Sequence, residues 1–121
     1  MVILAQKALL CLTLAVYQEA RGEPTIAQVG VAQVVLARHI KSNKTVCQVL
    51  KEPSQFPWAK RRIKVREPKA FVESEKIAKA VLYKKTRCKR LKGKYLFFNH
   101  HKAKPIKSNL PPVRIGKLLF T

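Results

Sequence analysis

The apolar residues of the first forty positions fall into two long segments, which a Gly-Glu-Pro break separates. The first segment is apolar from Ala8 to Val16, and Gly22 and Pro24 stop a helix well. Its apolar run also fits the core of a signal peptide, but cleavage near its end would disrupt the motif that follows. It is too short to span a bilayer. We therefore predict a first core helix over residues 2–21.

The second segment is rich in β-branched residues, so a strand competes with a helix there. Its length, and the spacing of Thr25 and Gln28, which matches a capping box, favour a buried helix. We predict this helix from Thr25 to about Ile40. Gly30 leaves room for another helix to approach closely.

The rest of the chain predicts shorter elements. Thr45 and Gln48 repeat the capping pattern before a short helix over 46–51, and Pro68 suits the first position of a helix over 68–85. One face of that helix carries an apolar stripe, made of Phe71, Ser74, Ala78, Val81 and Leu82. Residues 115–120 are expected to pair with an extended segment over 95–98. The pattern predicts a mainly α-helical single domain over residues 1–121, with a short β element near the C-terminus.

The net charge of the chain indicates more about its partners than its overall composition does. The chain has 26 Lys and Arg residues against six acidic ones, all Glu, and a formal net charge of +20. Such self-repulsion points to a polyanionic partner, which charge alone leaves open among nucleic acid, anionic lipid, lipopolysaccharide and cell-wall polymer. With no Asp, a Ser-His-Asp triad is excluded in its usual form, and four glycines provide no Gly-rich phosphate loop.

The three cysteines, Cys11, Cys47 and Cys88, are far apart in the sequence. They form no CxxC pair and no metal-ligand spacing, so we expect neither a metal site nor a cofactor. Reduced, buried thiols are the expected state, and a disulfide between two of them is the alternative.

The richest candidate chemistry lies where the first helix ends. Glu19 and Glu23 lie four residues apart in a chain with little acid. A carboxyl at a helix C-terminus, beside apolar neighbours, is favoured in its protonated form, which suits a general acid. The alternative is ordinary decoration of a helix end, with Arg21 as a local ion-pair partner.

The order of the motifs resembles that of a known family. Tyr17-x-Glu19-Ala20-Arg21-Gly22-Glu23 is followed by Gln55-Phe56-Pro57-Trp58, Phe97-Phe98-Asn99 and Ile115-Gly116. This resembles the SleB-type cell-wall hydrolases, which include spore cortex-lytic enzymes and phage relatives. Two departures lie near the C-terminus: the family's Pro-x-Trp reads Pro105-Ile106-Lys107, and its Ile-Gly-x-His reads Ile115-Gly116-Lys117-Leu118.

The resemblance implies a lysozyme-like, lytic-transglycosylase-like domain that cleaves the MurNAc–GlcNAc bond of peptidoglycan. It places the catalytic acid on Glu19. The residues then expected to bind substrate, or to support the glycan groove, are Tyr17, Glu23, Gln55, Phe56, Trp58, Phe98 and Asn99. For Glu23, a structural ion pair with Arg21 or Arg38 is the preferred interpretation.

The scarcity of carboxylates favours a lytic transglycosylase, because that reaction needs one enzymic acid/base and a hydrolase needs a second carboxylate. A muramidase and an N-acetylmuramoyl-L-alanine amidase are the alternatives among enzymes, although zinc ligands are poor here. A non-enzymatic basic protein that binds nucleic acid or the envelope is the alternative outside enzymes.

Biological context is inferred from the compact, basic chain. We expect a monomeric phage endolysin, which moves from the host cytoplasm to the periplasm and cell wall, and a bacterial envelope enzyme is the alternative. Its expected partners are peptidoglycan glycan strands and, through the basic surface, the anionic envelope.

Overall fold

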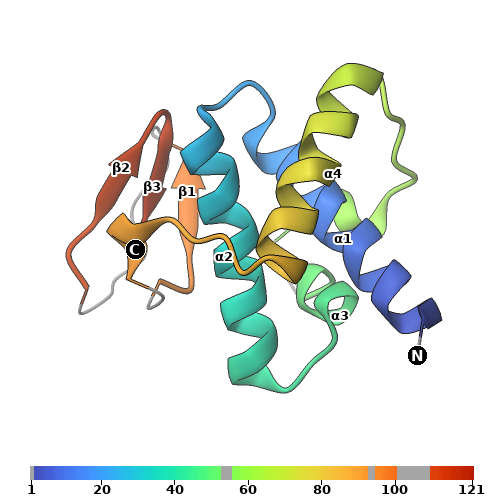
Figure 1. The fold of residues 1–121 in the computed structure, drawn as a ribbon, viewed down its shortest axis with the longest axis horizontal. Coiled ribbons are helices and arrows are strands. Elements are labelled where there is room, and N and C mark those ends of the chain that lie inside the picture. Colours follow the sequence, from blue (N-terminus) through green and yellow to red (C-terminus); the bar gives the residue numbers. More distant parts are fainter. Residues whose placement is uncertain (1, 53–55, 93–94, 101–109) are drawn as a thin grey trace.

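A computed structural model describes residues 2–52, 56–92, 95–100 and 110–121. It is mainly helical, as predicted, with a small antiparallel sheet built from the C-terminal part of the chain. The helices are α1 (Val2–Ala20), α2 (Thr25–Ser42), α3 (Val46–Leu50) and α4 (Pro68–Tyr83), with short 3-10 turns η1 (Pro57–Lys60) and η2 (Lys89–Leu91). In Figure 1, α2 runs between the sheet on one side and α1 with α4 on the other.

The core lies where α1, α2 and α4 pack against one another, and α3 closes one end against α1 and α2. Fully buried apolar side chains come from each long helix, among them Leu12 and Val16 of α1, Val31 and Val35 of α2, and Val81 of α4. The β-branched residues of the second segment therefore belong to a buried helix, and the competing strand is not formed.

The predicted helix ends are correct to within two residues, but only one of the two predicted capping boxes forms. At α3, Thr45 and Gln48 make both reciprocal bonds. At α2 the box is wrong, because Pro24 occupies the N-cap and no side chain caps the helix. Gln28 instead donates its Nε2–H to the carbonyl of Glu23, at 2.9 Å, and so ties the first turn of α2 to the end of the α1–α2 connection.

The sheet has three strands, β1 (Phe98–His100), β2 (Val113–Ile115) and β3 (Leu118–Phe120), in the order β1-β3-β2. Phe98 pairs with Phe120, as expected from the predicted contact between the two segments. The expected single segment over 115–120 is wrong, because Gly116 and Lys117 form a turn that makes β2 and β3 a hairpin. Gly116 has a φ of +59°, which glycine adopts at little cost.

Gly30 of α2 leaves room for a side chain of the sheet, and not for another helix as predicted. A Cβ at this position would lie 2.8 Å from Cζ of Phe120, and 3.2 Å from Cδ1 of Leu91. The missing side chain therefore lets the aromatic end of β3 press directly onto α2.

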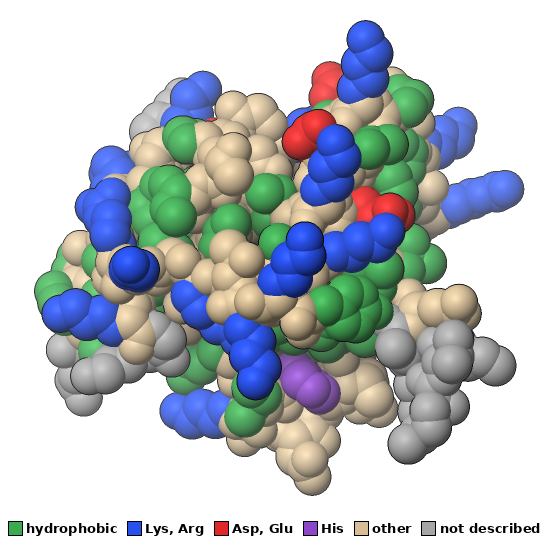
Figure 2. All heavy atoms as spheres, viewed as in Figure 1, with side chains coloured by type: hydrophobic (Ala, Val, Ile, Leu, Met, Phe, Trp, Pro, Cys, Tyr) green, Lys and Arg blue, Asp and Glu red, His purple; other side chains and the backbone are tan. Residues whose placement is uncertain are grey.

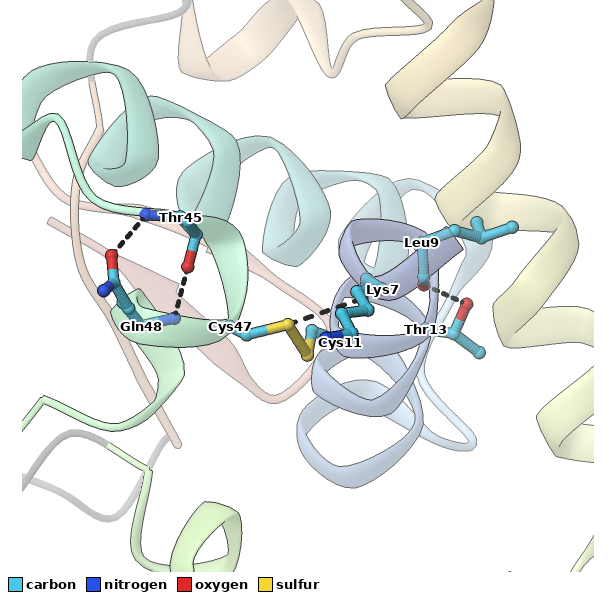
Figure 3. Close-up of a disulfide and its surroundings, with 7 residues drawn as sticks. All are labelled: Lys7, Leu9, Cys11, Thr13, Thr45, Cys47 and Gln48. Carbon is cyan, nitrogen blue, oxygen red and sulfur yellow. Dashed lines mark hydrogen bonds between the residues drawn. A yellow bond between two sulfur atoms is a disulfide. The ribbon is translucent and has the colours of Figure 1, made fainter. Parts of the chain in front are cut away.

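The cysteine prediction is wrong for two of the three residues. Cys11 of α1 and Cys47 of α3 form a disulfide, with Cα atoms 5.4 Å apart (Figure 3). Both residues are half-buried, so Cys47 is no core thiol. Only Cys88 remains a buried thiol. The link clamps α3 to the helix that carries Glu19.

The surface is cationic on the face drawn in Figure 2, where Lys and Arg side chains are spread widely and carboxylates gather near α4. No described helix combines the length and hydropathy that a membrane span needs.

Candidate active site

Glu19 lies in the last turn of α1 and meets the aromatic segment that follows α3. The indole Nε1–H of Trp58 donates a hydrogen bond to Oε1 of Glu19, at 2.9 Å. Both side chains are half-buried, so the pair lies at the edge of the core rather than within it. The structure thus brings together two predicted site residues that are 39 positions apart in the sequence.

Trp58 is held in place by a row of aromatic rings. It stands in η1, and its ring meets the edge of Phe56 at a centroid distance of 5.8 Å. Phe56 contacts Phe98, at 6.1 Å, and Phe98 contacts Phe120, at 6.0 Å. The row connects Trp58, which bonds Glu19, to the sheet. The sheet therefore supports the site indirectly, through these rings.

The buried side chain of Arg38 stabilises this row. The guanidinium of Arg38 lies 5.6 Å from the ring centroid of Phe56 and 5.2 Å from that of Phe97. Arg38 also pairs with Glu52, at 3.2 Å. Cation–π contacts of a largely desolvated arginine are stronger than those at the surface. Phe56 is itself almost fully buried, so it supports Trp58 and has little surface for a sugar.

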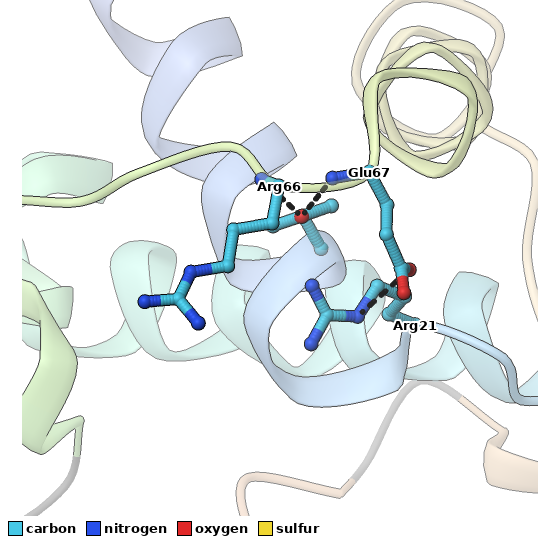
Figure 4. Close-up of polar contacts among 4 residues, drawn as sticks. Arg21, Arg66 and Glu67 are labelled. Atoms are coloured by element: carbon cyan, nitrogen blue, oxygen red, sulfur yellow. Dashed lines mark hydrogen bonds and ion pairs between the residues drawn. The ribbon is translucent and has the colours of Figure 1, made fainter.

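Tyr17 anchors the segment that leads into α4. It is completely buried, and its hydroxyl accepts hydrogen bonds from the backbone N–H groups of Arg66, at 3.2 Å, and Glu67, at 3.1 Å. Arg21 lies 4.7 Å above its ring and pairs with Glu67, at 3.3 Å (Figure 4). Burial raises the pKa of the phenol, but the hydrogen bonds from Glu67, Arg21 and Arg66 outweigh it, so the pKa is lowered overall. Tyr17 therefore positions residues 66 and 67, and has no exposed surface for a ligand.

Glu23 contacts the β hairpin rather than the aromatic segment. Its Oε1 accepts a hydrogen bond from the backbone N–H of Lys117, at 2.7 Å, in the turn of the β hairpin. The preferred interpretation, an ion pair with Arg21 or Arg38, is wrong, because those arginines pair with Glu67 and Glu52. Glu23 joins the end of α1 to the sheet.

The other carboxylates of the chain are engaged away from Trp58. Glu52 and Glu67 pair with the arginines named above, and on α4 Glu73 pairs with Lys76 and Glu75 with Lys79. Glu23 is held by the hairpin, and among the contacts of the described residues Glu19 is the glutamate that bonds Trp58. In the described part of the chain, no group of His, Cys and Glu residues is arranged to hold a metal ion.

A groove of about 470 Å³ opens beside this pair. Its lining includes Gln18, Arg21 and the fully buried Tyr17 of α1, and Trp58 of η1. The rest comes from the stretch that follows η1, which supplies Arg61, Arg62, Ile63, Lys64 and Arg66. The site residues predicted from the sequence do not include this basic run. Its position directly after the Pro-bracketed Trp58 is the signal that could have found it.

Two predicted site residues cannot be placed. Gln55 lies outside the described residues, and Asn99 is described only in its backbone, which pairs with Leu119 in the sheet. Phe98 is half-buried within the aromatic row. The structure thus joins Glu19, Trp58, Phe56 and Phe98 into one assembly, and separates Glu23 from it.

Comparison with known proteins gives one result. Residues 22–121 match the model of a protein family described as Cell Wall Hydrolase. The match includes Trp58 and the hairpin, and it begins just after Glu19. No curated protein and no solved structure matches the chain.

Proposed function

Since the chain belongs to the cell wall hydrolase family and so acts on peptidoglycan, we propose that it is a lytic transglycosylase with Glu19 as general acid and base. The scissile bond is the MurNAc–GlcNAc glycosidic bond. No second enzymic carboxylate takes part.

The observation that carries the proposal is the hydrogen bond between Glu19 and Trp58, together with the separate engagement of the other glutamates. Hydrolysis by inversion or retention uses a second carboxylate across the sugar, to activate water or to attack C1. Glu23 is held by the Lys117 backbone and Glu67 by Arg21, so neither is offered to that position. A reaction with one acid/base group fits this arrangement.

The contact with Trp58 also decides which oxygen carries the proton. An indole N–H is only a donor, so Oε1 of Glu19 must accept from it, and the acid form carries its proton on Oε2. Oε2 then protonates the glycosidic oxygen as the bond to C1 of MurNAc breaks. The resulting carboxylate takes the proton of the MurNAc 6-hydroxyl, whose oxygen bonds to C1 and closes a 1,6-anhydro ring. The Trp58 bond stabilises the carboxylate between these steps.

The place of action follows from the disulfide. The Cys11–Cys47 link is half-buried, and disulfides persist in oxidising compartments such as the periplasm. We therefore propose that the protein works as a monomer in the periplasm or cell wall. The motif resemblance to phage relatives favours an endolysin that leaves the host cytoplasm for the wall. The +20 charge attracts it to the anionic envelope.

Mass spectrometry of peptidoglycan digested by the purified protein tests the proposal. We expect muropeptides that end in 1,6-anhydro-MurNAc. Products with a reducing-end MurNAc would instead show hydrolysis, and a second glutamate would then have to activate water. Released stem peptides with intact glycan would show an amidase and overturn the glycosidase assignment.

A further inference from the structure

We propose that the cationic groove, defined by Arg21, Arg61, Arg62, Lys64 and Arg66, binds the carboxylates of the peptide stems attached to MurNAc. The inference rests on the proposed function, because it supplies the part of the substrate that Glu19 does not touch. It makes the enzyme selective for glycan that still carries its stems.

The groove concentrates positive charge, and its lining residues include no carboxylate. Five cationic side chains line one concavity of about 470 Å³. Among the described residues, Arg21 alone of the five pairs with a carboxylate, that of Glu67, at 3.3 Å. Like charges gathered in a concavity repel one another and focus a positive potential, which an anionic ligand relieves.

The groove is held in shape, unlike a solvated run of basic residues. At the C-terminal end of the basic stretch, the backbone N–H groups of Arg66 and Glu67 donate to the buried hydroxyl of Tyr17. At its N-terminal end, the carbonyl of Trp58 accepts a hydrogen bond from the N–H of Arg61, at 3.0 Å. Residues 61–66 are thus tied to α1 at one end and to η1 at the other.

Position identifies the occupant. Trp58 lines the groove and also bonds Glu19, and Gln18 in the groove wall is the neighbour of Glu19 on α1. A stem is covalently joined to the sugar that must lie at Glu19, so its carboxylates reach the groove at a high effective concentration. Guanidinium groups suit carboxylates, because they can donate two parallel hydrogen bonds.

The test compares two soluble substrates: glycan strands that carry stem peptides, and the same strands after an amidase has removed them. Cleavage and binding are measured for the unmodified protein, for Arg61→Gln/Arg62→Gln, and for Lys89→Gln/Arg90→Gln. The control pair removes the same charge from η2, outside the groove, and all four side chains are exposed. Both variants should therefore fold normally.

We expect the unmodified protein and the η2 control to prefer stem-bearing strands, in both KM and Kd. The groove variant should lose roughly three- to tenfold of that preference, because each exposed ion pair contributes little alone. Equal losses for both variants would assign the effect to net charge, and equal losses on both substrates would assign the groove to the sugar chain. Either result overturns the inference, as does a loss seen only with walls that carry phosphate polymers. If no strand is cleaved, the proposed function fails, while the binding preference still decides the role of the groove.

Discussion

The two glutamates near the end of α1 contact two different regions of the molecule. Glu19 accepts a hydrogen bond from the indole N–H of Trp58, which also lines the cationic groove. Glu23 accepts a hydrogen bond from the backbone N–H of Lys117, in the turn that joins β2 and β3. Both carboxylates are half-buried, and they lie four positions apart in the sequence.

The difference lies in what each partner allows. The indole N–H of Trp58 orients the carboxyl of Glu19 through one oxygen, as the proposed reaction requires. The N–H of Lys117 belongs to the backbone of a turn, and a carboxylate that accepts from it fastens the chain together. Proximity in sequence therefore does not make the two glutamates a catalytic pair.

The substitution Glu19→Gln should have the largest effect on activity. The amide keeps the size of the side chain and its acceptor for Trp58, but it cannot deliver a proton to the leaving oxygen. We expect kcat on peptidoglycan to fall by roughly 10²–10⁴-fold, with an unchanged melting temperature.

Glu23→Gln is the matched control, because its amide oxygen can still accept from the Lys117 N–H. Its activity should stay close to that of the unmodified protein. If Glu23→Gln were inactive and Glu19→Gln active, the two assignments would be reversed. Activity in both would remove the catalytic role from this motif.

Much of the fold, and part of the candidate site, could be predicted from the sequence. The Gly-Glu-Pro stop, the apolar periodicity and the proline at the start of α4 placed the helices to within two residues, because these signals are local. The motif also selected Glu19 and Trp58, although not the bond between them. The partner of Glu23 lies 94 positions away, and nothing in the local sequence marks the Lys117 N–H as that partner.

The other surprises have the same physical origin. Cys11 and Cys47 approach only because α3 packs across α1, a tertiary contact that cysteine spacing does not encode. The ring that fills the space at Gly30 belongs to Phe120, from the far end of the chain. The basic run over 61–66 becomes a groove wall only because the buried Tyr17 holds its end.

The substitution Gly116→Ala should disrupt the contact between Glu23 and the β hairpin. A Cβ there would overlap Oε1 of Glu23 and lie 2.8 Å from Cδ of Pro24, so the bond to Lys117 must yield. With the positive φ, we expect a loss of about 1–3 kcal/mol in the free energy of unfolding, measured by chemical denaturation.

Gly22→Ala separates the two causes. Gly22 also has a positive φ, of +81°, but a Cβ there would meet nothing within 4 Å. Its cost should be that of backbone strain alone, so the excess cost at Gly116 measures the crowding against Glu23 and Pro24. Equal costs at the two positions would mean that the hairpin does not depend on Glu23. The turnover of the folded fraction should not change in either variant.

Trp58→Phe tests the hydrogen bond between Trp58 and Glu19, and its effect should be the smallest. Phenylalanine keeps an aromatic ring against Phe56 but removes the N–H that bonds Glu19. Because water can reach this half-exposed position and replace part of the bond, we expect a loss of about 0.5–1.5 kcal/mol, roughly two- to tenfold in kcat. A rise in KM at constant kcat would mean that the indole stacks on the sugar, and a lower melting temperature at constant kcat would make it a packing residue.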